Sequence, residues 1–217
     1  MNTIKLKITD EIPQNVADCL KNGGVIAHAT ETVYGLACRW DNEAALERVA
    51  IIKQRPPEQP YSLLVNDVAS IFQLTGLDNL QMHNFLETLF PAPVTVLLPR
   101  IRDAKIAFWN DFPLLGFRLP DDPLCQKLVA TAGAPLITTS ANLSGEAPPV
   151  SAEKLSIKIA QHVDFILDSG SCKYQIPSMI VQLNNTLDTY RVIRTGAFST
   201  KDFDEIFRKF SSRKKQF

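Results

Sequence analysis

Hydrophobic and polar residues alternate along the chain with two periods, and each period predicts one type of secondary structure. A stripe at helical spacing runs from Ala45 to Ile52 behind Asn42, a residue type that favours the start of a helix. Short unbroken apolar runs, such as LLV at residues 63–65, are typical of buried strands. We expect helices over residues 10–21, 42–52, 67–74, 80–89, 123–132, 150–161 and 199–210, and strands over residues 25–29, 63–65, 94–98, 115–119, 135–139, 165–167, 179–183 and 190–193.

Strands and helices alternate over most of the chain, and two adjacent strands separated by Asn184-Asn185 follow near its end. This order predicts an α/β protein with a twisted, mixed β-sheet flanked by helices. A chain of 217 residues is long enough for one domain with a substantial core, and we expect a single domain over residues 1–217. The basic tail, residues 211–217, is expected to be frayed.

Composition narrows the class of protein. Lys plus Arg and Asp plus Glu number 23 each, so the formal net charge is zero, and binding of a polyanion would require a local cluster of cations. The four cysteines are widely spaced, which favours reduced thiols in the cytoplasm over a disulfide framework or a zinc site. No signal peptide or membrane-spanning run is evident, so we expect a cytoplasmic protein without a membrane partner.

The sequence lacks the common motifs that indicate a nucleotide-binding or metal-binding site. The sequence has no P-loop, no G-x-G-x-x-G and no G-x-S-x-G pattern. His28, His83 and His162 stand alone without metal-ligand spacing, and we expect each to be hydrogen-bonded or solvent-exposed. Any ligand must therefore be bound by polar residues at the ends of strands and helices, where α/β folds place their sites.

Lys53 and Arg55 stand at alternate positions where the helix 42–52 runs out. If the chain is extended beyond Ile52, both side chains point the same way and form a charge clamp suited to phosphate. The simpler interpretation of these residues alone is that they offset the negative end of the helix dipole.

Two further polar groups follow buried strands. Ser140 and Asn142 repeat the alternate spacing with a hydroxyl and an amide, and they could equally form a turn that satisfies loop backbone groups. Thr30 and Thr32 flank Glu31 and could be strand hydroxyls or a cap.

Arg118 lies inside the apolar strand LGFRL, where a charge needs a partner. Asp121 or Asp122 would provide one, and so would an anionic ligand. Arg194 ends a strand just before Gly196, and structural and functional interpretations of it are evenly matched. Together these groups suit a ligand with phosphates at one end and a small zwitterion at the other.

At these positions the sequence resembles the YrdC-type family of threonylcarbamoyl-AMP synthases, in particular its bacterial, single-domain TsaC-like members. The matching segments are residues 29–36 (ATETVYGL, family P-T-E-T-V-Y-G-L), 53–56 (KQRP, K-x-R), 90–95 (FPAPVT, W-P-G-P-V-T), 118–121 (RLPD, R-x-P-D), 140–145 (SANLSG, S-A-N-x-S-G), 177–181 (PSMIV, P-S-T-I-V) and 194–196 (RTG, R-P-G). No single segment is diagnostic, but six or seven in the right order are highly specific.

The resemblance implies a YrdC-like fold with a concave basic cleft. It implies a nucleotidyltransferase that makes L-threonylcarbamoyladenylate and pyrophosphate from L-threonine, bicarbonate and ATP, with Mg²⁺ accompanying ATP. The product would supply t6A at position 37 of tRNA through a partner transferase.

The resemblance also implies roles for individual residues. Threonine would be surrounded by Thr32, Arg118, Thr138 and Ser178. ATP would be bound by Lys53, Arg55, Gln59, Ser140, Asn142, Pro148 and Arg194, and Lys53 and Arg55 would also be catalytic. No protein side chain is identified as a metal ligand.

Departures from the family pattern are Ala29, Ala92, Met179 and Thr195, and Leu64 stands where some longer members carry a histidine that contacts threonine. We also expect no counterpart of the extra C-terminal domain of those members, so a loop that closes the site would come from elsewhere or be absent. Two alternative functions remain. One is a module that binds tRNA or double-stranded RNA, aided by residues 213–215, and the other is a paralogue with a different or unassigned activity.

Overall fold

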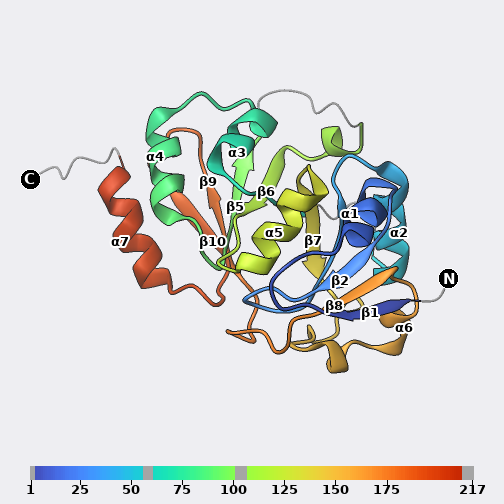
Figure 1. Cartoon of the computed structure of the whole chain (residues 1–217). Coiled ribbons are helices and arrows are strands. Elements are labelled where there is room, and N and C mark those ends of the chain that lie inside the picture. Colours follow the sequence, from blue (N-terminus) through green and yellow to red (C-terminus); the bar gives the residue numbers. More distant parts are fainter. Residues whose placement is uncertain (1–2, 56–60, 101–106, 212–217) are drawn as a thin grey trace, which may run out of the picture.

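The computed structural model describes residues 3–55, 61–100 and 107–211. Ten strands form one sheet with helices on both faces (Figure 1). The strands are β1 (Ile4–Lys7), β2 (Ile26–His28), β3 (Gly35–Arg39), β4 (Ser62–Leu64), β5 (Val94–Pro99), β6 (Leu114–Arg118), β7 (Leu136–Ser140), β8 (Phe165–Asp168), β9 (Met179–Leu183) and β10 (Tyr190–Arg194). The helices are α1 (Gln14–Lys21), α2 (Glu43–Lys53), α3 (Val68–Thr75), α4 (Leu80–Leu89), α5 (Pro123–Ala132), α6 (Ile157–Ala160) and α7 (Thr200–Phe210), with 3₁₀ turns η1 (Ala107–Asp111) and η2 (Ala152–Lys154).

The sheet is mixed, as the sequence predicts. Its strand order is β1-β8-β2-β3-β7-β4-β6-β5-β9-β10. β8 pairs in parallel with β1 and β2, and the pairs β4–β6 and β5–β9 are also parallel, whereas the remaining neighbours are antiparallel. The predicted hairpin of residues 179–183 and 190–193 is confirmed as β9 and β10.

Two apolar clusters lie on opposite faces of the sheet, because successive strand residues point to opposite sides. On β4, Leu63 belongs to the cluster under α2, α3 and α4, whereas Leu64 belongs to the cluster under α1 and α5. On β7, Ile137 and Leu136 divide in the same way. The strands are thus buried on both faces, which accounts for their unbroken apolar runs.

Most predicted helices are confirmed within a few residues. Asn42 caps α2 by accepting a hydrogen bond from the backbone nitrogen of Ala45, and α4 and α5 have the predicted bounds. The helix predicted over residues 150–161 is wrong: η2 and α6 replace it, because Leu155 and Ser156 adopt extended backbone angles between them. The sequence analysis also missed β1, β3 and η1.

α7 packs against α4, at the end of the sheet opposite the edge strand β1 (Figure 1). Phe203 and Phe207 are buried there and meet Phe85 edge-to-face at 5.9 Å between ring centroids. Among the described helices, none combines the length and the apolar character that crossing a membrane requires.

Candidate functional site

A cavity of about 320 Å³ opens where several strands of the sheet end. It is built by the loop after β2, the end of α2, strands β4 to β7, the loop after β7, and the β9–β10 pair. Its lining residues are Thr30, Thr32, Val33, Gly35, Lys53, Arg55, Ser62, Thr95, Arg118, Thr138, Thr139, Ser140, Asn142, Ser144, Gly145, Pro177, Ser178, Ile180 and Arg194.

The lining is cationic and rich in hydroxyl groups. Four side chains are lysine or arginine, nine carry a hydroxyl, and no described residue of the lining is a carboxylate or a histidine. Cations combined with hydroxyl donors bind phosphate and carboxylate oxygens well. The cavity is therefore suited to an anionic, oxygen-rich ligand.

Lys53 is the last residue of α2, and only 4% of it is exposed. Its ammonium donates hydrogen bonds to the backbone carbonyls of Ser140 and Asn142, the latter at 2.8 Å. Burial and the neighbouring Arg55 lower the pKa of Lys53 to about 8. Lys53 therefore connects the end of α2 to the loop after β7, and it is not an exposed helix-end charge.

The extended geometry predicted beyond Ile52 is wrong, because Gln54 adopts a left-handed conformation with φ 51°. Arg55 nevertheless reaches the same cavity as Lys53. Its Nη1 donates to Thr139 Oγ1 at 3.2 Å, and its guanidinium lies 4.8 Å from the centroid of the Tyr61 ring. Burial lowers the pKa of Arg55.

The loop after β7 is held by its own amide group. Asn142 Nδ2 donates to the carbonyls of Leu143 and Glu146 at 2.8 and 2.7 Å. Gly145 has a φ of 87°, which a residue with a side chain would adopt only with strain. The buried Oδ1 of Asn142 has no hydrogen-bond partner within the described chain, so an acceptor is left near the cavity.

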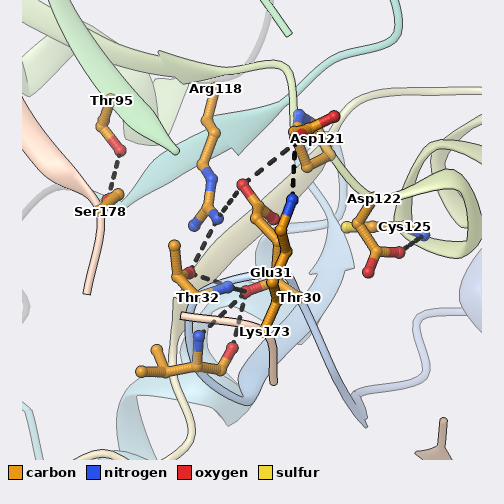
Figure 2. A network of polar contacts seen from close by, with 12 residues as sticks. Thr30, Glu31, Thr32, Thr95, Arg118, Asp121, Asp122, Cys125, Lys173 and Ser178 are labelled. Carbon is orange, nitrogen blue, oxygen red and sulfur yellow. Dashed lines mark hydrogen bonds and ion pairs between the residues drawn. The ribbon is translucent and has the colours of Figure 1, made fainter. Parts of the chain in front are cut away.

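Arg118, at the end of β6, has a different partner from those expected. Its Nη2 lies 2.7 Å from Glu31 Oε1, and both side chains are buried, at 6% and 1% exposure (Figure 2). Asp121 instead pairs with Lys173 at 3.7 Å, and Asp122 caps α5 by accepting from a backbone nitrogen. The expected aspartate partner is therefore wrong: Glu31, 87 positions earlier in the chain, neutralises Arg118.

The loop that carries Glu31 is held by threonine hydroxyls. Thr30 Oγ1 accepts hydrogen bonds from the backbone nitrogens of Thr32 and Val33 at 3.1 and 3.2 Å. Thr32 Oγ1 in turn accepts from Arg118 Nη2 at 2.8 Å (Figure 2). Of the two roles left open by the sequence, strand hydroxyl or cap, the structure shows the cap, at Thr30 in the loop after β2. The contact of Thr32 with Arg118 was not predicted.

Ser178 lies between two strands that are distant in sequence. Its Oγ is 3.0 Å from Thr95 Oγ1 of β5 (Figure 2). Arg194 of β10 donates to the Ser178 carbonyl at 3.1 and 2.8 Å and to Ser178 Oγ at 3.2 Å. A Cβ at Gly196 would come within 2.4 Å of the backbone at residues 177–179, so a residue without a side chain allows the two segments to approach this closely.

The structure brings most of the predicted site residues together. Those that line the cavity are Thr32, Lys53, Arg55, Arg118, Thr138, Ser140, Asn142, Ser178 and Arg194. Pro148 is not part of the lining, and Gln59 lies outside the described residues. The substrate that each residue contacts stays a prediction.

Sequence reasoning missed Thr95, Ser62 and Thr139 in the lining and Glu31 behind Arg118. Thr95 lies in the segment FPAPVT, one of those that resemble the family pattern, so this segment could have indicated that Thr95 lines the cavity. No pattern signals Ser62 or Thr139, because hydroxyl residues are common in strands.

Two departures from the family pattern lie away from the cavity. Leu64 is fully buried in the cluster under α1 and α5, and Met179 is fully buried in the cluster on the opposite face. Neither side chain is part of the lining. The substitutions at these two positions therefore leave the lining residues unchanged.

His28 is hydrogen-bonded, as expected, but through only one of its two ring nitrogens. Its Nδ1 contacts the Ala29 carbonyl at 2.8 Å, but its buried Nε2 has no partner in the described part of the chain. Burial is the largest effect on this imidazole and lowers its pKa to about 4, so it is neutral near pH 7. His28 does not line the cavity.

Fold and site together define an α/β protein with a cationic cavity at its strand ends and without a P-loop or a dinucleotide fingerprint. Residues 18–196 match the model of the Sua5/YciO/YrdC family, which carries the description telomere recombination. This chain belongs to that family.

Named relatives and solved structures agree with this assignment. A threonylcarbamoyl-AMP synthase of Chromohalobacter salexigens is 36% identical over 177 residues, which cover 81% of this chain and 94% of the relative. The structure of P. abyssi Sua5 complexed with L-threonine matches with a TM-score of 0.86 and 22% identity, covering 96% of this chain and 62% of that one. E. coli YciO matches with a TM-score of 0.80 and 24% identity, covering 93% of this chain and 99% of that one. At these identities, the two structures establish the fold.

Proposed function

We propose that this chain is a threonylcarbamoyl-AMP synthase, which forms L-threonylcarbamoyladenylate and pyrophosphate from L-threonine, bicarbonate and ATP. The observation that carries the proposal is a single cavity with four cations, nine hydroxyl side chains and no carboxylate in its described lining. Relatives named threonylcarbamoyl-AMP synthase, 36% identical to this chain, support the same activity.

The triphosphate of ATP would lie at the Lys53 and Arg55 end of the cavity. Arg55 offers a planar fork that can bind two phosphate oxygens, and Lys53 adds a point charge behind it. No carboxylate among the described residues forms an ion pair with Lys53, so its charge is available to an anion. Mg²⁺ bound to ATP would neutralise part of the phosphate charge, and phosphate oxygens would be its main ligands, because the described lining has no carboxylate.

L-Threonine would lie at the Arg118 end, beside the hydroxyls of Thr32 and Ser178. Arg118 and Glu31 form a neutral pair before any ligand binds. A zwitterion also has no net charge, so it adds none to this buried part of the site. The threonine carboxylate would bind to an edge of the guanidinium that Glu31 does not occupy.

The proposed chemistry has two steps. The ammonium group of threonine first loses a proton to solvent, and the neutral amine then adds to the carbon of bicarbonate with loss of water and gives a carbamate. A carbamate oxygen then forms a bond to the α-phosphorus of ATP, while the bond from that phosphorus to pyrophosphate breaks. Because the described lining has no histidine or carboxylate to act as a base, the rate would depend mainly on holding two anions together and stabilising charge at phosphorus.

The product would pass to a partner transferase that places the threonylcarbamoyl group on position 37 of tRNA. On this proposal the protein works in the cytoplasm, where ATP and tRNA are available. The chain would be the nucleotidyltransferase of the pathway and would not need to bind tRNA for its own reaction.

The test measures pyrophosphate released by purified protein from ATP, Mg²⁺ and bicarbonate, with and without L-threonine. Release that requires L-threonine supports the proposal. Release driven by another amino acid would identify a paralogue with a different acceptor. Absence of release together with tight, salt-sensitive tRNA binding would identify an RNA-binding module instead.

A further inference from the structure

Thr95 of β5 lines the cavity, although no role for it follows from the sequence patterns. Only 3% of the residue is exposed. Within the described chain, the one hydrogen-bond contact of its side-chain hydroxyl is to Ser178, with 3.0 Å between the two hydroxyl oxygens (Figure 2). Thr95 therefore meets a ligand chiefly through Ser178.

The other contacts of Ser178 limit what its hydroxyl can do. A serine hydroxyl has one hydrogen to donate and two lone pairs that accept. Arg194 Nη2 donates to Ser178 Oγ at 3.2 Å and so occupies one lone pair. The two bonds from Arg194 to the Ser178 carbonyl fix the backbone at the same point.

The hydrogen bond between Thr95 and Ser178 can run in either direction. If Ser178 donates to Thr95, a lone pair of Ser178 is left for a ligand that donates. If Thr95 donates to Ser178, both lone pairs of Ser178 are filled and its hydrogen is left for a ligand oxygen. The described lining has four cations and no carboxylate, so it favours ligand groups that accept hydrogen bonds, such as the carboxylate oxygens of an amino acid. The second direction matches such a ligand.

The position of Thr95 is fixed by the sheet. β5 and β9 are parallel neighbours, and Thr95 lies opposite Ile180. Ser178 comes two positions before Ile180, so the pairing of the strands sets the distance between Thr95 and Ser178. The methyl group of Thr95 lies beside Gly116 of β6, where an added Cβ would be 3.4 Å from Thr95 Cγ2, in van der Waals contact. A β-branched side chain confined in this way has few rotamers, and its hydroxyl is preorganised.

We propose that Thr95 is a positioning residue that donates its hydroxyl hydrogen to Ser178, so that Ser178 donates to an oxygen of the bound amino acid. This inference rests on the proposed function, which places L-threonine at this end of the cavity. Thr95 sets the direction of the Ser178 hydroxyl and thereby the affinity for the amino acid.

The experiment is a double-mutant cycle on the full chain, read out by calorimetric titration with L-threonine. Thr95→Val keeps the side-chain shape and removes the hydroxyl, and it should raise the Kd about threefold to tenfold. Thr95→Ser keeps the hydroxyl and should stay within about twofold of the wild type. Ser178→Ala should also raise the Kd, and Thr95→Val should then add little in the Ser178→Ala background.

A merely structural role for Thr95 would give a different result. In that case Thr95→Val would weaken binding by the same factor with and without Ser178, and the inference would be overturned. An unchanged Kd in Thr95→Val would overturn it as well. If the wild-type protein neither binds L-threonine nor releases pyrophosphate with it, the proposed function fails first, and the wild-type titration together with the pyrophosphate assay reveals this.

Discussion

Lys53 and Arg118 are two buried cations of the same cavity, and their charges are compensated in different ways. Arg118 is paired with the carboxylate of Glu31 at 2.7 Å. Within the described chain, the ammonium of Lys53 donates hydrogen bonds to the carbonyl oxygens of Ser140 and Asn142 and forms no ion pair. A buried charge is costly unless a partner compensates it, so the kind of partner determines what each end of the cavity can bind.

Carbonyl dipoles solvate an ammonium but do not cancel its charge. The lowered pKa of Lys53, about 8, is consistent with incomplete compensation and with the nearby charge of Arg55. A polyanion would complete the compensation at this end. The end at Arg118 is already neutral, so it suits a zwitterion. The comparison thus separates a phosphate end from an amino-acid end.

The largest expected effect comes from removing Glu31, the carboxylate that pairs with Arg118. Glu31→Gln should lower the free energy of unfolding by about 3 kcal/mol, because it leaves the Arg118 charge buried and unpaired. Denaturation by guanidinium chloride would measure the change. The control is Asp121→Asn, which removes a half-exposed carboxylate 3.7 Å from Lys173 and should cost less than about 0.5 kcal/mol. Similar losses in both variants would contradict the assigned pairing.

At the other end, Lys53→Met should lower kcat/KM for ATP about a hundredfold, because it removes a charged contact to phosphate and releases the loop after β7. The assay is threonine-dependent pyrophosphate release. Lys201→Met, at a largely exposed lysine of α7, serves as the control and should leave the rate unchanged. If Lys53→Met kept the wild-type kcat/KM, Lys53 would have no part in ATP use.

Strand β10 offers a matched pair of arginines. Arg194 lines the cavity and donates to Ser178, whereas Arg191 is exposed and donates to Gln182 on β9 at 3.2 Å. Arg194→Ala should raise the KM for ATP about tenfold, the loss expected for one charge-assisted hydrogen bond. Arg191→Ala should leave KM within about twofold. Equal effects would mean that Arg194 has no part in binding the nucleotide.

The smallest expected effect is a dependence on pH. Because an anion favours protonated Lys53, and the pKa of Lys53 without ligand is about 8, the KM for ATP should rise above that pH. We expect an increase of about fivefold between pH 7 and pH 9, measured from initial rates. The increase should be absent in Lys53→Met, and a flat profile in the wild-type protein would contradict a charged role for Lys53.

The ionisation of Lys53 should also affect folding stability, but here a rise in pH is favourable. The pKa of Lys53 is lowered on folding from 10.5 to about 8, so the unfolded chain binds more protons between these values. The contribution of Lys53 to stability therefore increases as pH rises through that window. Unfolding curves of the wild type and Lys53→Met, compared at pH 7.5 and 10, would isolate this contribution.

Much of the fold was predictable because local patterns and tertiary structure agree. Asn42, Asp122 and Ser199 are cap residues at helix starts that the sequence places correctly or within one residue. Failures occurred where long-range contacts decide the backbone. The polar-rich β1 is a strand only because it pairs with β8, more than 150 residues later.

In the candidate site, too, features set by local sequence were predictable and features set by long-range contacts were not. Short motifs identified most of the side chains that converge on the cavity, because those residues were quoted from segments of the family pattern. The partner of Arg118 was not predictable, because Asp121 and Asp122 are near in sequence whereas Glu31 is near only in the fold. Burial of Lys53 was also missed, since the helix pattern does not show that the loop after β7 covers its end.

The most direct test of the central claim is a crystal structure of this chain with L-threonine and a non-hydrolysable ATP analogue. We expect both ligands in the one cavity, with the amino-acid carboxylate on Arg118 and the phosphates within hydrogen-bond distance of Arg55. Ligands bound elsewhere, or the nucleotide phosphates at Arg118 and the amino acid at Lys53, would contradict the assignment of the two ends.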